Sequence, residues 1–161
     1  MSIAIVLVEP EIPQNTGNIA RTCAAVGASL HLVKPLGFSV SDKHVRRAGL
    51  DYWNLVDVHV HENLHAVQRA LSDRKWVLVT KKAKTSYTDI EYNKDVCLFF
   101  GKETAGLPES FLSSYPESCV RIPMVPDARS LNLSNAAAVL VYEALRQQNF
   151  PGLSIPYPDI L

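Results

Sequence analysis

The chain has 161 residues, of which 47% are hydrophobic and 20% are charged, a balance typical of one globular domain with a substantial core. Lysine plus arginine number 16, as do aspartate plus glutamate, so no net positive field draws the chain to nucleic acid and any RNA contact needs a local patch. The sequence has no apolar run of membrane-spanning length, no signal peptide and no paired cysteine spacing. These features predict a cytoplasmic domain with reduced thiols and without a disulfide, a bound metal or a membrane segment.

Strand and helix patterns alternate along the chain. Continuous aliphatic runs predict buried strands over residues 3–8, 30–33, 56–60, 76–80, 96–100 and 119–122. Apolar residues at helical spacing predict helices over residues 19–26, 42–48 and 62–71, the first with residues 15–18 as its capping turn and Gly27 as its C-cap. This alternation predicts an α/β fold, a mostly parallel sheet flanked by helices, with ligands at the carboxyl ends of the strands.

A glycine-bracketed loop follows the strand predicted over residues 96–100. Gly101 and Gly106 enclose this loop, and both permit close approach of the backbone to a bound group. The spacing lacks the Lys-Ser/Thr ending of a phosphate loop, and no G-x-G-x-x-G occurs in the chain. Neither a nucleoside triphosphatase nor a nicotinamide-dependent enzyme is therefore favoured.

A proline-bent loop leads into the last predicted helix. Pro123 and Pro126 exclude regular structure over residues 123–129, and apolar residues at helical spacing predict a helix from residue 133 to about residue 148. Ser130 or Asn132 is the candidate N-cap. This stretch alone favours an ordinary capped helix, but the presence of a second loop of similar character indicates one pocket formed by both.

Clusters of basic residues and histidines allow more than one interpretation. Lysines, arginines and a histidine gather at residues 43–47 and lysines at residues 81–84, and each cluster is either a solvated face or a phosphate-binding patch. His31, His59 and His61 lack a neighbouring cluster of metal ligands, which favours structural or surface histidines. Residues 1–161 are predicted to form a single domain, with residues 152–161 as a tail.

Three ordered segments resemble the motifs of SPOUT-class RNA ribose 2′-O-methyltransferases. They are residues 15–21, residues 98–108, and residues 122–124 together with 130–135. Residues 9–13 and 46–52 extend the resemblance over nearly the whole chain. The chain is most similar to the small subgroup that methylates the wobble nucleotide, a cytidine or modified uridine at position 34, of leucine tRNAs. The resemblance implies a C-terminal trefoil knot, S-adenosylmethionine as cofactor, and an obligate homodimer.

The resemblance also implies roles for individual residues. Arg21 takes the catalytic position, and because a guanidinium is a poor base we expect it to orient the ribose hydroxyl and stabilise developing alkoxide charge. Substrate contacts fall on Asn15, Asn18, Arg46 and Asn135. Cofactor contacts fall on Val79, Thr80, Gly101, Glu103, Ile122, Met124, Ser130 and Leu131. The alternative is a non-catalytic RNA-binding or assembly factor that retains the fold, and the intact motifs argue against it.

The last predicted helix has apolar residues on both sides. At 100° per residue, one face gathers Leu133, Ala136, Ala137, Leu140, Val141 and Ala144 and suits the core, whereas Ala138, Val139 and Tyr142 lie opposite. Exposed single apolar residues are common, so the pattern alone leaves an ordinary surface and an interface equally open. The resemblance favours a homodimer contact through Val139 and Tyr142.

Overall fold

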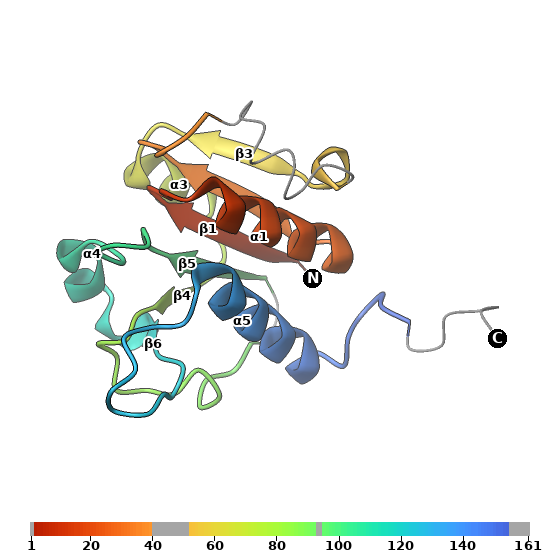
Figure 1. Ribbon diagram of the computed structural model, residues 1–161. Coiled ribbons are helices and arrows are strands. Elements are labelled where there is room, and N and C mark those ends of the chain that lie inside the picture. The colour runs from red at the N-terminus through yellow and green to blue at the C-terminus, as the bar shows by residue number, and fades with distance from the viewer. Residues whose placement is uncertain (1, 40–51, 93–94, 155–161) are drawn as a thin grey trace.

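The computed structural model describes residues 2–39, 52–92 and 95–154, whose arrangement Figure 1 shows as a ribbon. The helix predicted over residues 42–48, the basic cluster at residues 43–47 with Arg46, and most of the predicted tail lie outside these residues. Within the described part of the chain no helix is long and apolar enough to cross a membrane.

A parallel sheet forms the centre of the molecule, as the alternating pattern predicted. Its order is β3-β2-β1-β5-β4-β6, and every named pair of strands is parallel. The strands are Ile3–Val8 (β1), Ser29–Val33 (β2), Val58–His61 (β3), Lys75–Val79 (β4), Val96–Phe100 (β5) and Cys119–Val120 (β6). β1 and β5 are buried along their whole length, which is why their sequences are continuous apolar runs.

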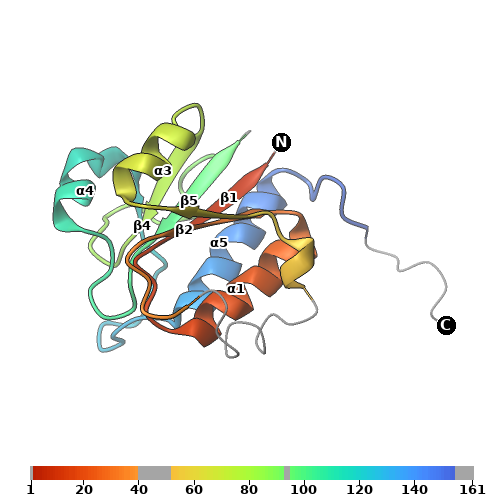
Figure 2. The same ribbon diagram turned by 90° about the horizontal axis from the view of Figure 1, so that it is seen from above.

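Helices cover both faces of the sheet, as Figure 2 shows. One face carries α1 (Pro13–Val26) and α5 (Leu133–Gln147), which pack against the side chains of Ile5 and Leu98. The other face carries the shorter α3 (Leu64–Ala70) and α4 (Glu109–Ser114). Short 3-10 turns occur at Trp53–Leu55 and Pro116–Ser118. The C-terminal trefoil knot remains a prediction from the resemblance.

The structure corrects several predicted boundaries. α1 starts at Pro13, so residues 15–18 belong to its first turns instead of capping it; a proline fits the first helical position because its missing N–H needs no acceptor there. The C-cap Gly27 is confirmed, with φ of 70°. β3 starts two residues later than predicted because Trp53–Leu55 forms a 3-10 turn, and β6 is only two residues long. α4 was not predicted.

The cysteines form no disulfide, and two of them are deeply buried. Burial raises the pKa of Cys23 and of Cys97 to about 12. Cys119 is only half-buried, because β6 lies at the edge of the sheet. No group of His, Cys, Asp or Glu among the described residues is arranged to hold a metal ion.

A histidine cluster lies across β2 and β3. His31 is 5% exposed, and its ring accepts or donates hydrogen bonds at both nitrogens: Nε2 lies 3.1 Å from Ser29 Oγ, and Nδ1 lies 2.9 Å from His61 Nε2. His59 stacks on His31 at a ring separation of 4.6 Å. Burial first, then the nearby His59, His61 and Arg74, lower the pKa of His31 to about 4 against the opposing effect of Asp57.

This cluster predicts a loss of stability in mild acid. The unfolded chain takes up a proton at His31 near pH 6.5, but the folded chain does so only near pH 4, so unfolding binds protons in this interval and stability falls as the pH falls. The contribution of His31 is at most about 3.5 kcal/mol, since its pKa falls from 6.5 to about 4 and one pKa unit corresponds to about 1.4 kcal/mol. Urea unfolding between pH 7 and pH 4 should show a shallower pH dependence in His31→Gln than in the exposed control His65→Gln. Equal slopes would contradict the prediction.

Candidate functional site

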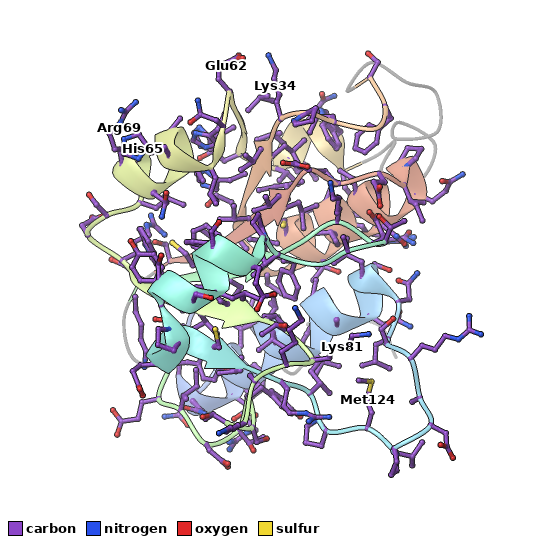
Figure 3. All side chains as sticks on the ribbon, turned by 90° about the vertical axis from the view of Figure 1, so that its left-hand side faces the viewer. Lys34, Glu62, His65, Arg69, Lys81 and Met124 are labelled. Atoms are coloured by element: carbon purple, nitrogen blue, oxygen red, sulfur yellow. The ribbon has the colours of Figure 1, made fainter. Side chains whose placement is uncertain are left out.

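Loops at the carboxyl edge of the sheet enclose a pocket of about 460 Å³, a volume within the range of small-molecule sites. Figure 3 looks onto this edge, with Lys81 after β4 and Met124 after β6 near one another. The wall of this pocket contains every residue that the resemblance assigns to the cofactor: Val79, Thr80, Gly101, Glu103, Ile122, Met124, Ser130 and Leu131. Residues from separate loops and from the start of α5 therefore converge on one pocket.

Gly101 is required by the folding of its own loop. A Cβ placed on Gly101 would lie 1.9 Å from the carbonyl carbon of Gly106 and 2.0 Å from the backbone nitrogen of Leu107. The Gly106 N–H donates to the Lys102 carbonyl oxygen at 2.8 Å, which closes the loop, and Gly106 has a φ of 73°. The close backbone contact that these glycines allow is therefore formed within the loop itself.

The carboxylate of Glu103 organises the beginning of α1. Glu103 Oε2 accepts from the Glu11 backbone N–H at 2.8 Å, and Oε1 accepts from the Ile12 N–H at 3.2 Å and from Asn15 Nδ2 at 2.9 Å. α1 has no acidic residue in its first turn, so Glu103 supplies the negative charge that a helix N-terminus favours. In return, the Thr104 N–H and hydroxyl donate to the Glu11 carboxylate at 2.9–3.0 Å.

Asn15 and Asn132 extend this network to α5. Asn15 is 5% exposed, and its Oδ1 accepts from Asn132 Nδ2 at 3.0 Å. Asn132 Oδ1 accepts from the Ser134 N–H at 2.9 Å and from the Ser134 hydroxyl at 2.6 Å, which identifies Asn132 and not Ser130 as the N-cap of α5. The network therefore connects the three segments that carry the resemblance.

The other predicted site residues that the structure describes lie outside the pocket wall. Asn18 and Asn135 are exposed near the starts of α1 and α5, and Arg46 lies outside the described residues. Arg21 is exposed on α1, with its guanidinium carbon 5.1 Å from the ring centroid of Tyr52. Since Arg21 follows Asn15 by six residues, it lies about 9 Å farther along the helix axis than that pocket residue.

Several wall residues are not singled out by the sequence, although the glycine-bracketed loop as a whole is predicted to line the pocket. The sequence predicts Asn132 only as a possible helix cap. Asn132 nevertheless belongs to residues 130–135, which are part of the third segment that carries the resemblance. The others come from the glycine-bracketed loop and its neighbours, and include Lys102, Thr104 and Leu107. Their side chains gave no signal in the sequence because loop residues have no periodic pattern.

The pocket wall fits an adenosyl group. Apolar side chains of Val79, Ile122 and Leu131 offer surface for a flat ring system. The backbone N–H groups of Ile122, Met124 and Leu131 donate no hydrogen bond to any other described residue, so they are available to a ligand's ring nitrogens and hydroxyls. Apolar side chains and free backbone donors in one wall are the combination that a nucleoside requires.

Known proteins share this architecture over most of its length. The SpoU rRNA Methylase family matches residues 2–142. A tRNA (cytidine(34)-2′-O)-methyltransferase of Methylovorus glucosotrophus (strain SIP3-4) is 52% identical over 149 residues, which cover 92% of this chain and 97% of the relative. A solved structure described as "Structural insights into the 2-OH methylation of C/U34 on tRNA" has a TM-score of 0.88 and 42% identity, with 92% of this chain and 97% of that chain covered.

A more distant neighbour carries a cofactor. The SpoU methyltransferase AviRb from Streptomyces viridochromogenes, in complex with AdoMet (S-adenosylmethionine), has a TM-score of 0.80 and 27% identity, with 92% of this chain and 58% of that chain covered. The similarity to these proteins in sequence and in fold identifies the chain as a SPOUT-class methyltransferase. Within that class, the chain belongs to the SpoU rRNA methylase family.

Proposed function

We propose that this protein is a tRNA 2′-O-methyltransferase that uses S-adenosylmethionine to methylate the ribose of nucleotide 34, a cytidine or modified uridine. The observation that carries the proposal is the pocket, because one hollow gathers all the residues expected to contact the cofactor. The relative from Methylovorus, 52% identical, is named for methylation at cytidine 34. We further propose that the substrates are leucine tRNAs, recognised at the anticodon loop in the cytoplasm.

In this proposal, different pocket residues have different roles. Val79, Ile122 and Leu131 pack on the adenine, and the free backbone N–H groups near them fix its orientation. Bound S-adenosylmethionine supplies an electrophilic methyl group on a positively charged sulfur. Glu103 acts by position, since its carboxylate oxygens are occupied by N–H donors from residues 11–15 and hold α1 against the pocket. Proximity and orientation of the ribose hydroxyl then lower the barrier to transfer.

Arg21 is the proposed catalytic residue, and its position indicates how it acts. Its guanidinium is exposed and does not line the pocket of its own chain. We propose that Arg21 acts on the pocket of a second subunit, where it orients the 2′-hydroxyl and stabilises the charge on oxygen as the proton leaves. Asn18 and Asn135, exposed near the starts of α1 and α5, are proposed to contact the RNA.

The proposed homodimer uses the outer side of α5. Tyr142 is 49% exposed there, as the helical pattern predicted. Val139 is partly buried against the core cluster beneath α5, so less of it is available for a partner than the pattern suggested. The core-facing side is confirmed, with Ala137, Leu140, Val141 and Ala144 buried. Tyr142 is therefore the principal contact residue in this proposal.

Tyr142→Asp is expected to yield a folded monomer that transfers no methyl to tRNA. A carboxylate at a two-fold contact would be buried without a partner, and each pocket would lose the second subunit. Sedimentation gives the mass, and labelled S-adenosylmethionine gives the activity. Val60, 45% exposed on the edge strand β3, provides the control Val60→Asp, which should remain dimeric and active. An intact, fully active Tyr142→Asp dimer would rule out this interface.

The proposed activity is tested directly with tRNA from a strain that lacks it. Purified protein with methyl-labelled S-adenosylmethionine should label the 2′-oxygen of nucleotide 34 in leucine isoacceptors, and digestion of the tRNA identifies the labelled nucleotide. Calorimetry measures cofactor binding in the same preparation. Cofactor binding without transfer to any tRNA would instead support the non-catalytic alternative.

A further inference from the structure

A second hollow, of about 650 Å³, continues from the cofactor pocket. The two share Lys81, Glu103, Thr104, Met124 and Ser130, so an occupant of one borders an occupant of the other. The second hollow is closed on its far side by the proline-bent loop over residues 123–129, whose residues 125–129 are exposed. Lys81 and Met124, which line both hollows, lie near one another in Figure 3.

The charges around this hollow are unevenly compensated. Lys81, Arg121 and Arg129 line it, and none of them forms an ion pair with another described residue. By contrast, the other lysines of the neighbouring pocket are neutralised: Lys82 pairs with Glu109, and Lys102 pairs with Glu9 at 2.9 Å. Unpaired cations are thus confined to one side of the site.

Acidic groups offset these cations only in part, because two carboxylates and three cations line the hollow. Asp127 and Glu103 also line the hollow, but the oxygens of Glu103 already accept from three N–H donors. The chain as a whole is neutral, with 16 basic and 16 acidic residues, so this local excess is the kind of patch through which a neutral protein contacts a polyanion.

We propose that Lys81, Arg121 and Arg129 hold a backbone phosphate of the RNA next to the ribose that is methylated. The inference rests on the proposed function, since it names where the substrate lies relative to the cofactor. A ribose 2′-hydroxyl has its 3′-phosphate on the adjacent carbon, so a hydroxyl at the mouth of the cofactor pocket places a phosphate within the next hollow. Arginine forks match the geometry of phosphate oxygens.

The cofactor's own carboxylate is a second source of anionic oxygens. We assign the hollow to phosphate because three unpaired cations exceed what one carboxylate needs, especially beside the positive sulfur and ammonium of the same molecule. The hollow is also bounded by an exposed loop, as a polymer that continues beyond the site requires.

The test is the salt dependence of tRNA binding. Arg121→Gln/Arg129→Gln should bind tRNA about tenfold more weakly than wild type, and the slope of log affinity against log salt should decrease by about one. Affinity for S-adenosylmethionine, measured by calorimetry, should change less than twofold. Arg69→Gln removes an exposed arginine on α3, well away from Lys81 in Figure 3, and should keep the wild-type slope. Arg121→Lys/Arg129→Lys retains both charges and should keep most of the wild-type slope.

Each outcome has a distinct meaning. If the salt dependence of tRNA binding is unchanged in Arg121→Gln/Arg129→Gln, the inference is overturned. If that salt dependence is unchanged and cofactor binding is tenfold weaker, the hollow is assigned to the cofactor carboxylate. If the double variant unfolds, Arg129→Gln alone gives the same reading, because Arg129 lies in an exposed loop. Wild-type protein that binds tRNA but transfers no methyl contradicts the proposed function, whereas an active wild type with an unchanged slope in the variant contradicts only this inference.

Discussion

Arg21→Ala is expected to reduce methyl transfer by about 100- to 1000-fold while cofactor affinity stays within about twofold of wild type. Arg21 lies outside the pocket wall, so removing its side chain leaves the cofactor contacts intact. The lost interaction exists only when charge develops on the ribose oxygen, which lowers the turnover number and not cofactor binding. Single-turnover transfer to tRNA and calorimetry with S-adenosylmethionine measure the two effects separately.

Two further results would test the role of Arg21. Arg21→Lys keeps the positive charge but loses the planar fork that lies over Tyr52, so partial activity would separate charge from geometry. A variant Arg21→Ala that retains more than about a third of wild-type turnover would rule out the catalytic role.

Gly101→Ala is expected to abolish measurable cofactor binding. The added methyl group would lie 1.9 Å from the carbonyl carbon of Gly106, and backbone atoms cannot yield as a flexible side chain would. The loop must therefore open, which displaces Glu103 and its hydrogen bonds to residues before α1. Calorimetry and tRNA methylation should both show the loss, while the buried strands keep the fold.

Gly106→Ala is the matched control for Gly101→Ala. A Cβ on Gly106 meets no atom within 4 Å, so the substitution costs only the strain of its φ of 73°. That strain is about 1–2 kcal/mol, and weakened but detectable cofactor binding is expected. Equal affinities of Gly101→Ala and wild-type protein would show that the observed loop conformation is not required for binding.

The two inactive variants together test whether Arg21 acts across the dimer. Arg21→Ala and Gly101→Ala subunits are unfolded, mixed and refolded, so that half the dimers are mixed. If Arg21 serves the partner's pocket, one site of each mixed dimer has neither defect, and the mixture regains about a quarter of wild-type activity. If Arg21 serves its own pocket, every site carries a defect and no activity returns.

The sheet was predictable because a buried strand has a recognisable apolar sequence. Strands such as β1 and β5 are buried along their whole length and therefore apolar at every position, and the alternation of strands with helices implies parallel pairing. α5 was predicted nearly to the residue since its core-facing residues repeat at helical spacing. α1 began earlier than predicted because its first turns carry polar residues that are buried in the site, which helical periodicity does not register.

The fold class, the order of the elements and the polar segments that carry the resemblance can be read from the sequence. The contacts that those polar residues make follow only from the tertiary structure. Glu103 holds the Glu11 backbone across 92 positions of the chain, and Asn132 reaches Asn15 across 117. Such hydrogen bonds depend on which strand ends become neighbours in the sheet, and neighbouring ends are set by long-range packing. Apolar periodicity reports burial, but it does not report which polar group meets which.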